Sequence, residues 1–169
     1  MNSINLVQPD SVPSFAIGFR RLWSPFHDIQ SEVLKELNQA QKKIRVSMYG
    51  FTLAPLVDIL IAKHQAGLDI KVLLDLSQSK GTAEAPQVKR LQDAGVDVVI
   101  GKSPVSGQIL HEKCFSIDDK RTISGSWNSS LSAQKQFNHC DFIWSKDLVD
   151  VFNQVFDYLR ELVIEEEKK

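Results

Sequence analysis

The hydrophobic positions alternate between helical and strand spacing along most of the chain. Apolar residues recur every three or four positions between Asp28 and Lys42, which predicts an amphipathic helix capped by the Asp28 carboxylate. Similar spacing predicts further helices at 53–66, 85–94 and 148–162. Between the helices, short alternating or continuous apolar runs predict strands near 44–49, 70–76, 96–100, 109–117, 121–124 and 141–144.

This order of elements predicts a single α/β domain. Strand–helix–strand alternation in the first part of the chain implies crossover connections, whereas residues 118–120 indicate a hairpin turn between two later strands. We therefore expect a mixed, mostly parallel β-sheet flanked by helices on both faces. The domain is expected to span 1–169, with its core at about 26–160 and flexible ends at 1–14 and 165–169.

Composition and charge narrow the possible functions. With 43% hydrophobic and 24% charged residues, the chain is expected to be globular rather than disordered. Its formal net charge of −1 excludes polyanion binding by a bulk positive field, so any such contact needs a local patch. Segment 101–140, with five basic and three acidic residues, is the best candidate. No signal peptide or membrane span is visible, which predicts a cytoplasmic protein.

Two short runs, 111–118 and 125–128, hold the residues best suited to chemistry. On a strand, side chains two positions apart share a face, so His111 and Lys113 are expected to point the same way. The predicted hairpin then returns the chain and brings Asn128 beside both side chains. An imidazole, an ammonium group and a carboxamide should therefore converge on one spot.

These groups are suited to a phosphate ester. Lys113 provides a point charge for phosphate oxygens, and Ser126 and Asn128 add neutral hydrogen-bond donors. His111 provides a nitrogen that can act as a nucleophile or as a proton carrier near neutral pH. No carboxylate cluster for a divalent metal lies in this stretch, so the pattern predicts phosphoryl transfer without a metal or another cofactor.

The spacing of these residues resembles the signature of a known superfamily. His111, Lys113, Asp118, Gly125-Ser126 and Asn128 match His-x-Lys-x4-Asp-x6-Gly-Ser-x-Asn, the HKD motif of the phospholipase D superfamily. The resemblance covers about 26–160, and the layout is similar to that of the small, single-motif members of the Nuc endonuclease type. It implies a phospholipase D-like fold with one HKD half-site in each chain.

The resemblance also implies a two-step mechanism through a phosphohistidine intermediate. The family's active site needs two copies of the motif, so this chain is expected to form a homodimer with one site across its twofold axis. One His111 would attack phosphorus and the other would protonate the leaving oxygen. Lys113 and Asn128, assisted by Ser126, would hold the phosphate oxygens. Asp118 is the fourth catalytic residue that the motif implies, and it would support the site structurally and electrostatically rather than react directly.

One feature of the Nuc-type members has no counterpart in this chain. They carry a glutamate shortly after the motif asparagine that orients the nucleophilic histidine, where this chain has residues 137–141 without any glutamate. Asp141 is the nearest acidic candidate for that role, and Asn138 or His139 is the alternative. An imidazole without a carboxylate partner is held less firmly in one tautomer, so we expect reduced catalytic efficiency.

The leading hypothesis is a homodimeric, metal-independent phosphodiesterase that acts as a nonspecific endonuclease on DNA or RNA. A lipid phosphodiesterase of the phospholipase D or cardiolipin-hydrolase type is the first alternative. It would need an apolar rim beside the site, and the sequence pattern predicts no exposed amphipathic helix to provide one. A nucleic-acid-binding module with weak turnover is the second alternative, which the missing glutamate supports.

Overall fold

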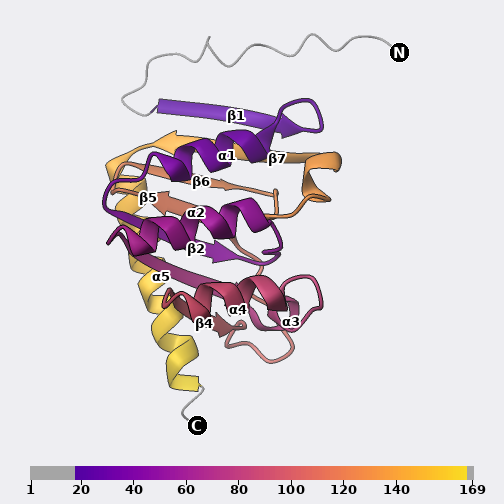
Figure 1. Ribbon diagram of the computed structural model, residues 1–169, viewed down its shortest axis with the longest axis vertical. Helices are drawn as coiled ribbons and strands as arrows, with labels where there is room; N and C mark the ends of the chain where they lie inside the picture. The colour runs from indigo at the N-terminus through magenta and orange to yellow at the C-terminus, as the bar shows by residue number, and fades with distance from the viewer. Residues whose placement is uncertain (1–17, 167–169) are drawn as a thin grey trace.

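The computed structural model describes residues 18–166, which form one sheet and its surrounding helices (Figure 1). In chain order the elements are β1 (Gly18–Ser24), α1 (Ile29–Asn38), β2 (Lys43–Met48), α2 (Ala54–Gln65), β3 (Asp69–Asp75), α3 (Leu76–Ser79), α4 (Ala85–Asp93), β4 (Asp97–Gly101), β5 (Lys113–Ile117), β6 (Arg121–Gly125), the short 3-10 helix η2 (Ala133–Lys135), β7 (Asn138–Trp144) and α5 (Lys146–Glu166).

The seven strands form a single sheet in the order β1-β7-β6-β5-β2-β3-β4. Only β2–β3 and β3–β4 pair in parallel, through the crossovers that contain α2 and α4. The other four pairings are antiparallel. The predicted mixed sheet with helices on both faces is therefore confirmed, but the expectation that it is mostly parallel is wrong.

A tight turn accounts for the antiparallel pairing of β5 with β6. Asp118 and Asp119 both have φ of 54°, a left-handed conformation that aspartate tolerates, and so tight a turn can join only antiparallel strands. This confirms the predicted hairpin turn. Strand β1, which the pattern did not predict because Arg20 and Arg21 interrupt its apolar residues, pairs antiparallel with β7 at the outer edge of the sheet.

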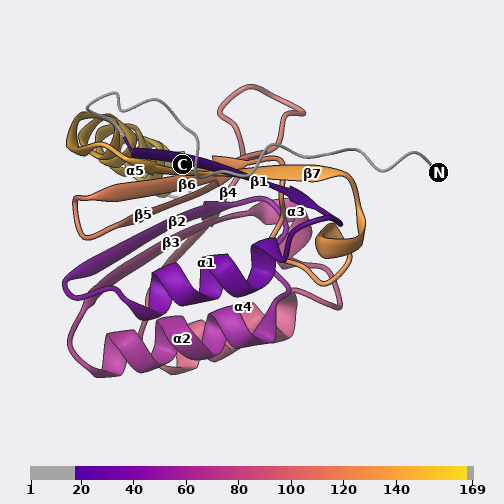
Figure 2. The same cartoon turned by 90° about the horizontal axis from the view of Figure 1, so that it is seen from above.

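The helices form a layer on each face of the sheet. Figure 2 shows α1, α2 and α4 on one face and α5 on the other. Val33 and Leu37 of α1 are fully buried, as are Ile44 and Val46 of β2, and all four belong to the main core. Burial of each such side chain contributes roughly 1.5–3 kcal/mol to folding, so the predicted amphipathic stripe is what fixes α1 on the sheet.

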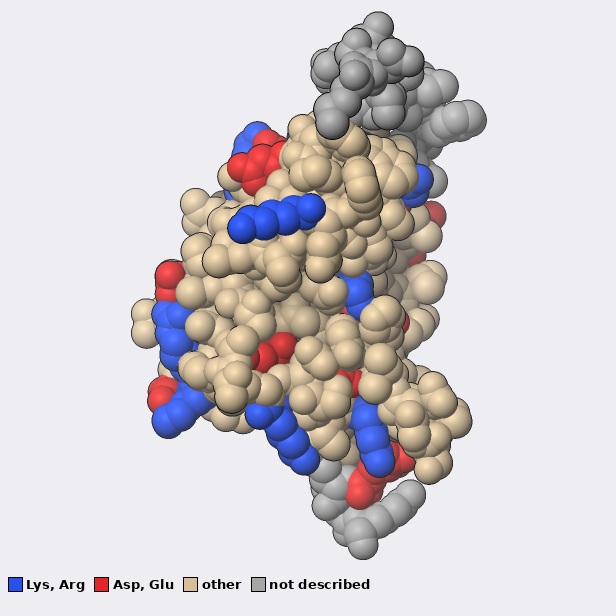
Figure 3. All heavy atoms as spheres, turned by 90° about the vertical axis from the view of Figure 1, so that its right-hand side faces the viewer, with Lys and Arg blue, Asp and Glu red and all other residues tan. Residues whose placement is uncertain are grey.

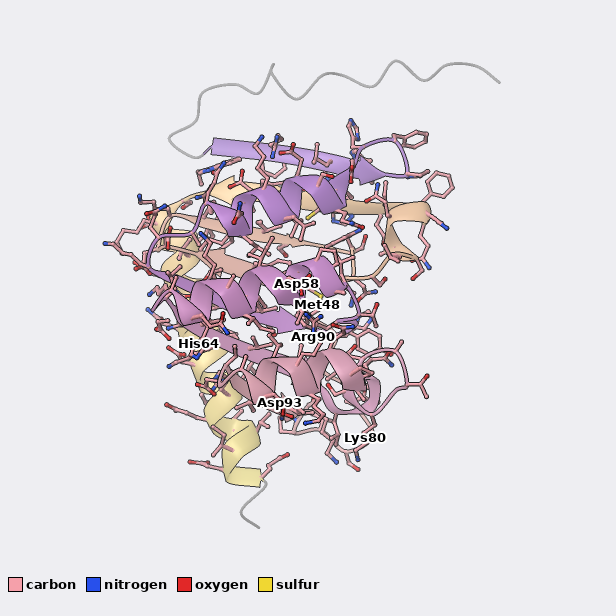
Figure 4. The ribbon with its side chains drawn as sticks, in the orientation of Figure 1. Met48, Asp58, His64, Lys80, Arg90 and Asp93 are labelled. Atoms are coloured by element: carbon pink, nitrogen blue, oxygen red, sulfur yellow. The ribbon has the colours of Figure 1, made fainter. Side chains whose placement is uncertain are left out.

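Polar contacts set the positions of the helices at their ends and flanks. As predicted, the Asp28 carboxylate caps α1 and accepts a 3.0 Å hydrogen bond from the backbone N–H of Ser31. Asp58 of α2 pairs with Arg90 of α4, and both residues are labelled in Figure 4. On the other face, the guanidinium of Arg160 in α5 donates to the Val72 carbonyl oxygen of β3 at 3.0 Å.

The C-terminal helix is longer than its apolar stripe predicts. It continues through Glu166, so residues 165 and 166 are helical, and the expected flexibility of this end stays a prediction. The remaining segments expected to be flexible, 1–14 and 167–169, lie outside the described residues. No helix within 18–166 has both the length and the apolar character that crossing a bilayer requires.

One edge of the sheet gathers the strand ends that matter for function. β1, β2, β3, β4 and β6 end there, and β5 and β7 begin there, at the right in Figure 1. The register agrees, since Met48 lies opposite Lys113 and Ser24 lies opposite Asn138. We call this side, with its loops 25–28, 49–53, 76–84, 102–112 and 126–137, the carboxyl edge.

Candidate active site

His111 and Lys113 lie together at the carboxyl edge. Lys113 is the first residue of β5, and His111 lies in the segment that leads into it. The Lys113 side chain is buried, whereas His111 is exposed. The Lys113 Nζ donates to the His111 carbonyl oxygen at 3.0 Å. Burial lowers the pKa of Lys113, although the negative charges of Asp75 and Glu112 oppose that shift.

Tyr49 packs against both of these residues. Its ring meets the His111 imidazole edge to face, with 4.7 Å between the ring centres, and the Lys113 Nζ lies 4.9 Å from the Tyr49 ring centre. The Tyr49 hydroxyl in turn accepts a 2.9 Å hydrogen bond from Gln78 Nε2. Sequence reasoning assigned Tyr49 no role, although its position directly after β2, at an edge that tends to carry binding sites, was the available signal.

Asn128 is held at the same place by a close backbone approach. The Gly50 N–H donates to Asn128 Oδ1 at 3.2 Å, and a Cβ atom at Gly50 would lie only 3.2 Å from that oxygen. At Gly125, which begins the turn before Asn128, a Cβ atom would lie 2.3 Å from the His139 carbonyl oxygen, so this turn needs glycine. With Oδ1 engaged, the Asn128 amide presents Nδ2 as its donor to a ligand.

Asp75 ties the segment before His111 to the end of β3. One of its carboxylate oxygens accepts a 2.9 Å hydrogen bond from the backbone N–H of Leu110. The other accepts from the backbone N–H groups of Ser77 and Gln78 at 2.9 and 3.1 Å. Asp75 is completely buried, so these bonds are shielded from water and fix the position of the chain next to His111.

Glu84 does the same for the chain next to Gly50. Its Oε2 accepts from the backbone N–H of Phe51 at 2.6 Å, and its Oε1 accepts from the Ser79 hydroxyl at 3.2 Å. Burial raises the pKa of Glu84, and these two hydrogen bonds offset that shift only in part. Neither Asp75 nor Glu84 was found from the sequence, because nothing in their residue type or spacing marks them as support for the motif.

Ser126 and Asn138 contact each other rather than His111. The Ser126 hydroxyl donates to Asn138 Oδ1 at 3.1 Å and accepts from the backbone N–H of His139 at 3.1 Å. These bonds join the turn that carries Asn128 to the first residues of β7. The His139 ring packs against Trp23, with 5.5 Å between the ring centres. Roles for Ser126 in phosphate binding, and for Asn138 or His139 in orienting His111, stay predictions.

Asp141 and Asp118 are occupied elsewhere. Arg21 donates to both Asp141 oxygens, at 2.6 and 2.7 Å, across β1 and β7. Asp118 follows β5 at the end opposite His111 and accepts from the backbone N–H groups of residues 41, 42 and 43 at 2.8, 2.7 and 3.1 Å. Burial alone would raise the pKa of Asp118, but these bonds outweigh it and hold the pKa below its usual value.

Apolar side chains line one side of His111. A cavity of about 200 Å³ adjoins it, between loop 102–112 and the last turns of α5, with Leu159, Leu162 and Val163 among its walls. Across the site, on loops 25–28 and 126–137, Phe26, Leu131 and Phe137 are 58%, 67% and 84% exposed. These exposed apolar side chains of the carboxyl edge therefore lie on loops and not on a helix. Within 18–166, no three potential ligands cluster to hold a metal ion.

The sheet and the grouping of His111, Lys113 and Asn128 at its carboxyl edge define a phospholipase D-like protein. The family described as "Cardiolipin synthase, PLD-like domain" matches residues 33–160. The chain therefore belongs to this phospholipase D-like family, as its HKD motif predicts.

Curated relatives agree with this membership. Over 104 residues the chain is 32% identical to a phospholipase D of Rickettsia typhi, a match that covers 62% of this chain and 48% of the relative. It is 27% identical over 138 residues to a mitochondrial cardiolipin hydrolase of Danio rerio, covering 78% of this chain and 59% of the relative. The chain thus spans about half the length of the curated relatives it matches.

Solved structures show the same fold. Nuc of Salmonella typhimurium, a phospholipase D family member, superposes with a TM-score of 0.79 at 22% identity, covering 87% of this chain and 95% of Nuc. NucT of Helicobacter pylori superposes with a TM-score of 0.77 at 15% identity, covering 86% of this chain and 96% of NucT. The predicted phospholipase D-like fold is therefore confirmed.

Proposed function

We propose that this protein hydrolyses phosphodiesters without a metal ion, through a phosphohistidine formed on His111, and that nucleic acid is its substrate. The observation that supports this most strongly is the grouping of three side chains at one edge of the sheet. An exposed imidazole and a buried ammonium group pack against Tyr49, and the next residue, Gly50, binds the oxygen of a carboxamide and leaves its N–H₂ group as a donor. These are a nucleophile and two donors for the phosphate oxygens.

The proposed reaction has two displacements at phosphorus. In the first, a nitrogen of His111 forms a bond to phosphorus, the bond to the leaving oxygen breaks, and a second imidazolium gives that oxygen a proton. In the second, water attacks phosphorus, its proton passes to the second imidazole, and the phosphorus–nitrogen bond breaks. The products are an alcohol and a phosphate monoester, and both imidazoles return to their starting states.

The second imidazole is proposed to be the partner's His111 in a homodimer. One HKD motif per chain provides one nucleophile, and a twofold axis near the site would place two copies face to face. Two exposed apolar surfaces offer area for such contact: Leu148, Val151, Val155 and Tyr158 on α5, and Phe19, Trp23 and Trp144 on β1 and β7.

A nucleic-acid substrate fits the exposed lysines of the carboxyl edge. Lys80, Lys102 and Lys135 are exposed on three of its loops, and none of them forms an ion pair within residues 18–166. Phosphates on either side of the cleaved bond could contact these ammonium groups. Such contacts carry no base information, so cleavage with little sequence preference is expected.

The test compares the wild-type protein with His111→Ala on bis(p-nitrophenyl) phosphate and on a single-stranded oligonucleotide, with and without EDTA. We expect hydrolysis that survives EDTA and disappears in the variant, and a phosphate adduct on His111 by rapid-quench mass spectrometry. His64→Ala, on the far side of the sheet, is the matched control (Figure 4).

The other outcomes separate the alternatives. Loss of activity in EDTA would refute the metal-independent reaction. Turnover of phospholipid vesicles but not of oligonucleotides would replace the nuclease by a lipid phosphodiesterase. Tight oligonucleotide binding without product would favour a binding module with weak turnover.

A further inference from the structure

The carboxyl edge combines exposed apolar side chains with unpaired positive charge. Phe26 lies on the loop after β1, and Leu131 and Phe137 lie on the loop between β6 and β7. The Phe26 and Phe137 rings contact each other, so they form a continuous exposed apolar surface of the kind that marks interaction sites. Figure 3 faces this edge and shows long basic side chains projecting from a surface that is mostly uncharged.

We propose that the carboxyl edge docks on an anionic phospholipid bilayer, with Phe26, Leu131 and Phe137 inserted among the lipids. We call these three side chains the apolar rim. The inference goes beyond phosphodiester hydrolysis, because it concerns the surface to which the protein binds. It applies equally whether the substrate is a nucleic acid or another phosphodiester. A catalytically dead variant should bind equally well.

The charges around the apolar rim favour a bilayer of negative headgroups. Loop 126–137 contains Lys135 and no acidic residue. Lys80 and Lys102 lie farther along the same edge, on the loops after β3 and β4, and the label in Figure 4 places Lys80 there. An edge that carries both inserted apolar groups and lysines gains from burial among acyl chains and from attraction to anionic headgroups.

Apolar surface also continues on the opposite side of His111. Val105 and Ile109 are 62% and 43% exposed on loop 102–112. Ile109 also lines the cavity beside His111. A flat bilayer surface can contact apolar side chains on both sides of His111 at once.

Base stacking explains the apolar rim less well. The rings of Phe26 and Phe137 already contact each other, 6.0 Å apart and tilted by 43°, so a base cannot lie flat between them. Leu131 has no aromatic face to stack on a base.

The test is co-sedimentation of the full chain with phosphatidylcholine vesicles that do or do not contain phosphatidylglycerol. We expect sedimentation with the anionic vesicles. Combined replacement of Phe26, Leu131 and Phe137 by Ser should reduce partitioning on the order of tenfold or more. The paired control, Val151→Ser with Val155→Ser, replaces exposed apolar residues of α5 and, compared at equal oligomeric state, should leave binding unchanged.

The lysines are tested in the same assay. Lys135→Gln and Lys102→Gln should each reduce binding to anionic vesicles roughly fivefold. Lys120→Gln, at an exposed lysine in the turn on the opposite edge of the sheet, is the control and should have little effect. If the triple variant is poorly folded, the single variant Phe137→Ser replaces it in the assay. Its side chain is 84% exposed, so its loss should not disturb folding.

Several results would overturn the proposal. These are no sedimentation with anionic vesicles, sedimentation that the serine variants do not alter, or a change in oligomeric state when the apolar rim is replaced. Loss of oligonucleotide binding without any vesicle binding would assign the surface to nucleic acid instead. His111→Ala separates this proposal from the hydrolytic one, since it should abolish turnover and leave sedimentation intact.

Discussion

The Glu84 carboxylate accepts a 2.6 Å hydrogen bond from the backbone N–H of Phe51, although 33 residues separate the two in sequence. The residue before Phe51 is Gly50, whose own N–H donates to Asn128. One buried carboxylate therefore determines where an active-site amide is held. Glu84 is a positioning residue, because it touches the backbone beside the site rather than a reacting group.

Glu84→Gln and Glu84→Ala should have different effects. The glutamine amide can still accept from the Phe51 N–H and can donate to the Ser79 hydroxyl, so activity should be largely retained. Glu84→Ala leaves the Phe51 N–H unpaired in the interior, at a cost of about 1–3 kcal/mol of folding free energy. Its kcat should fall while the protein remains folded. Thermal unfolding and steady-state kinetics on bis(p-nitrophenyl) phosphate measure both effects.

The same residue predicts a pH dependence of stability. Because burial raises the pKa of Glu84 in the folded state, its contribution to stability is complete below the ordinary glutamate pKa. That contribution is lost as pH rises through the raised, folded-state value. The wild-type melting temperature should therefore decline relative to that of Glu84→Gln as the pH rises above the ordinary glutamate pKa. Parallel curves over this range would show that Glu84 does not titrate as the buried group described.

Lys113 predicts a pH limit on activity rather than on stability. Burial lowers its pKa, so the ammonium group loses its proton at a lower pH than an ordinary lysine does. On the alkaline side, kcat/KM should accordingly begin to fall at a lower pH than the ordinary lysine pKa would predict. Lys113→Arg, which keeps its charge, should move that decline to higher pH even if its maximal rate is lower. Lys120→Arg is the control, and an unchanged alkaline limb in Lys113→Arg would contradict the assignment.

Asp118 is expected to matter for stability and not for chemistry. Asp118→Ala removes the acceptor of three backbone N–H groups, which should cost on the order of 3 kcal/mol of unfolding free energy. Because its folded-state pKa is lowered, this stabilisation is present above the ordinary aspartate pKa and is lost as pH falls through the folded value. Asp119→Ala, next in the turn, serves as the control. A large loss of kcat in folded Asp118→Ala would instead place Asp118 in the reaction.

The parts of the site that local geometry determines could be predicted from the sequence. The tight turn after β5 returns β6 beside it, so the motif spacing brings both of its runs to one edge of the sheet. His111 lies before β5 and not on the expected strand 109–117, so a shared strand face does not explain its place beside Lys113. Helix α1 could be predicted for a similar reason, because its buried stripe and its cap lie within one short segment. In both cases the interacting residues are close in sequence.

Contacts between distant segments could not be predicted in this way. Asp75 and Glu84 reach backbone N–H groups near His111 and Gly50, and a backbone donor leaves no residue-type signature. Strand β1 escaped prediction because an edge strand tolerates charged residues such as Arg21, which pairs across the sheet with Asp141. Phe26 and Phe137 are single apolar residues in polar loops, and only the fold brings them into contact.

Mixed dimers test whether two chains share one active site. Wild-type chains would be co-refolded with an increasing excess of His111→Ala chains that carry a different tag. If each site needs both imidazoles, a mixed dimer has one imidazole and cannot turn over normally. Activity should then fall with the square of the wild-type fraction.

Independent sites predict a linear decline instead, and a linear result would refute the shared site. Dilution with His64→Ala chains controls for refolding losses, because His64 lies across the sheet from the carboxyl edge (Figure 4).

The p-nitrophenyl substrate sharpens the distinction, because its good leaving group needs little help from an acid. A mixed dimer should therefore release one burst of p-nitrophenol from its single His111 and then hydrolyse the intermediate slowly, since water activation requires the missing imidazole. A burst without turnover from mixed dimers would show that one His111 acts as the nucleophile and that the partner's His111 acts as the proton carrier.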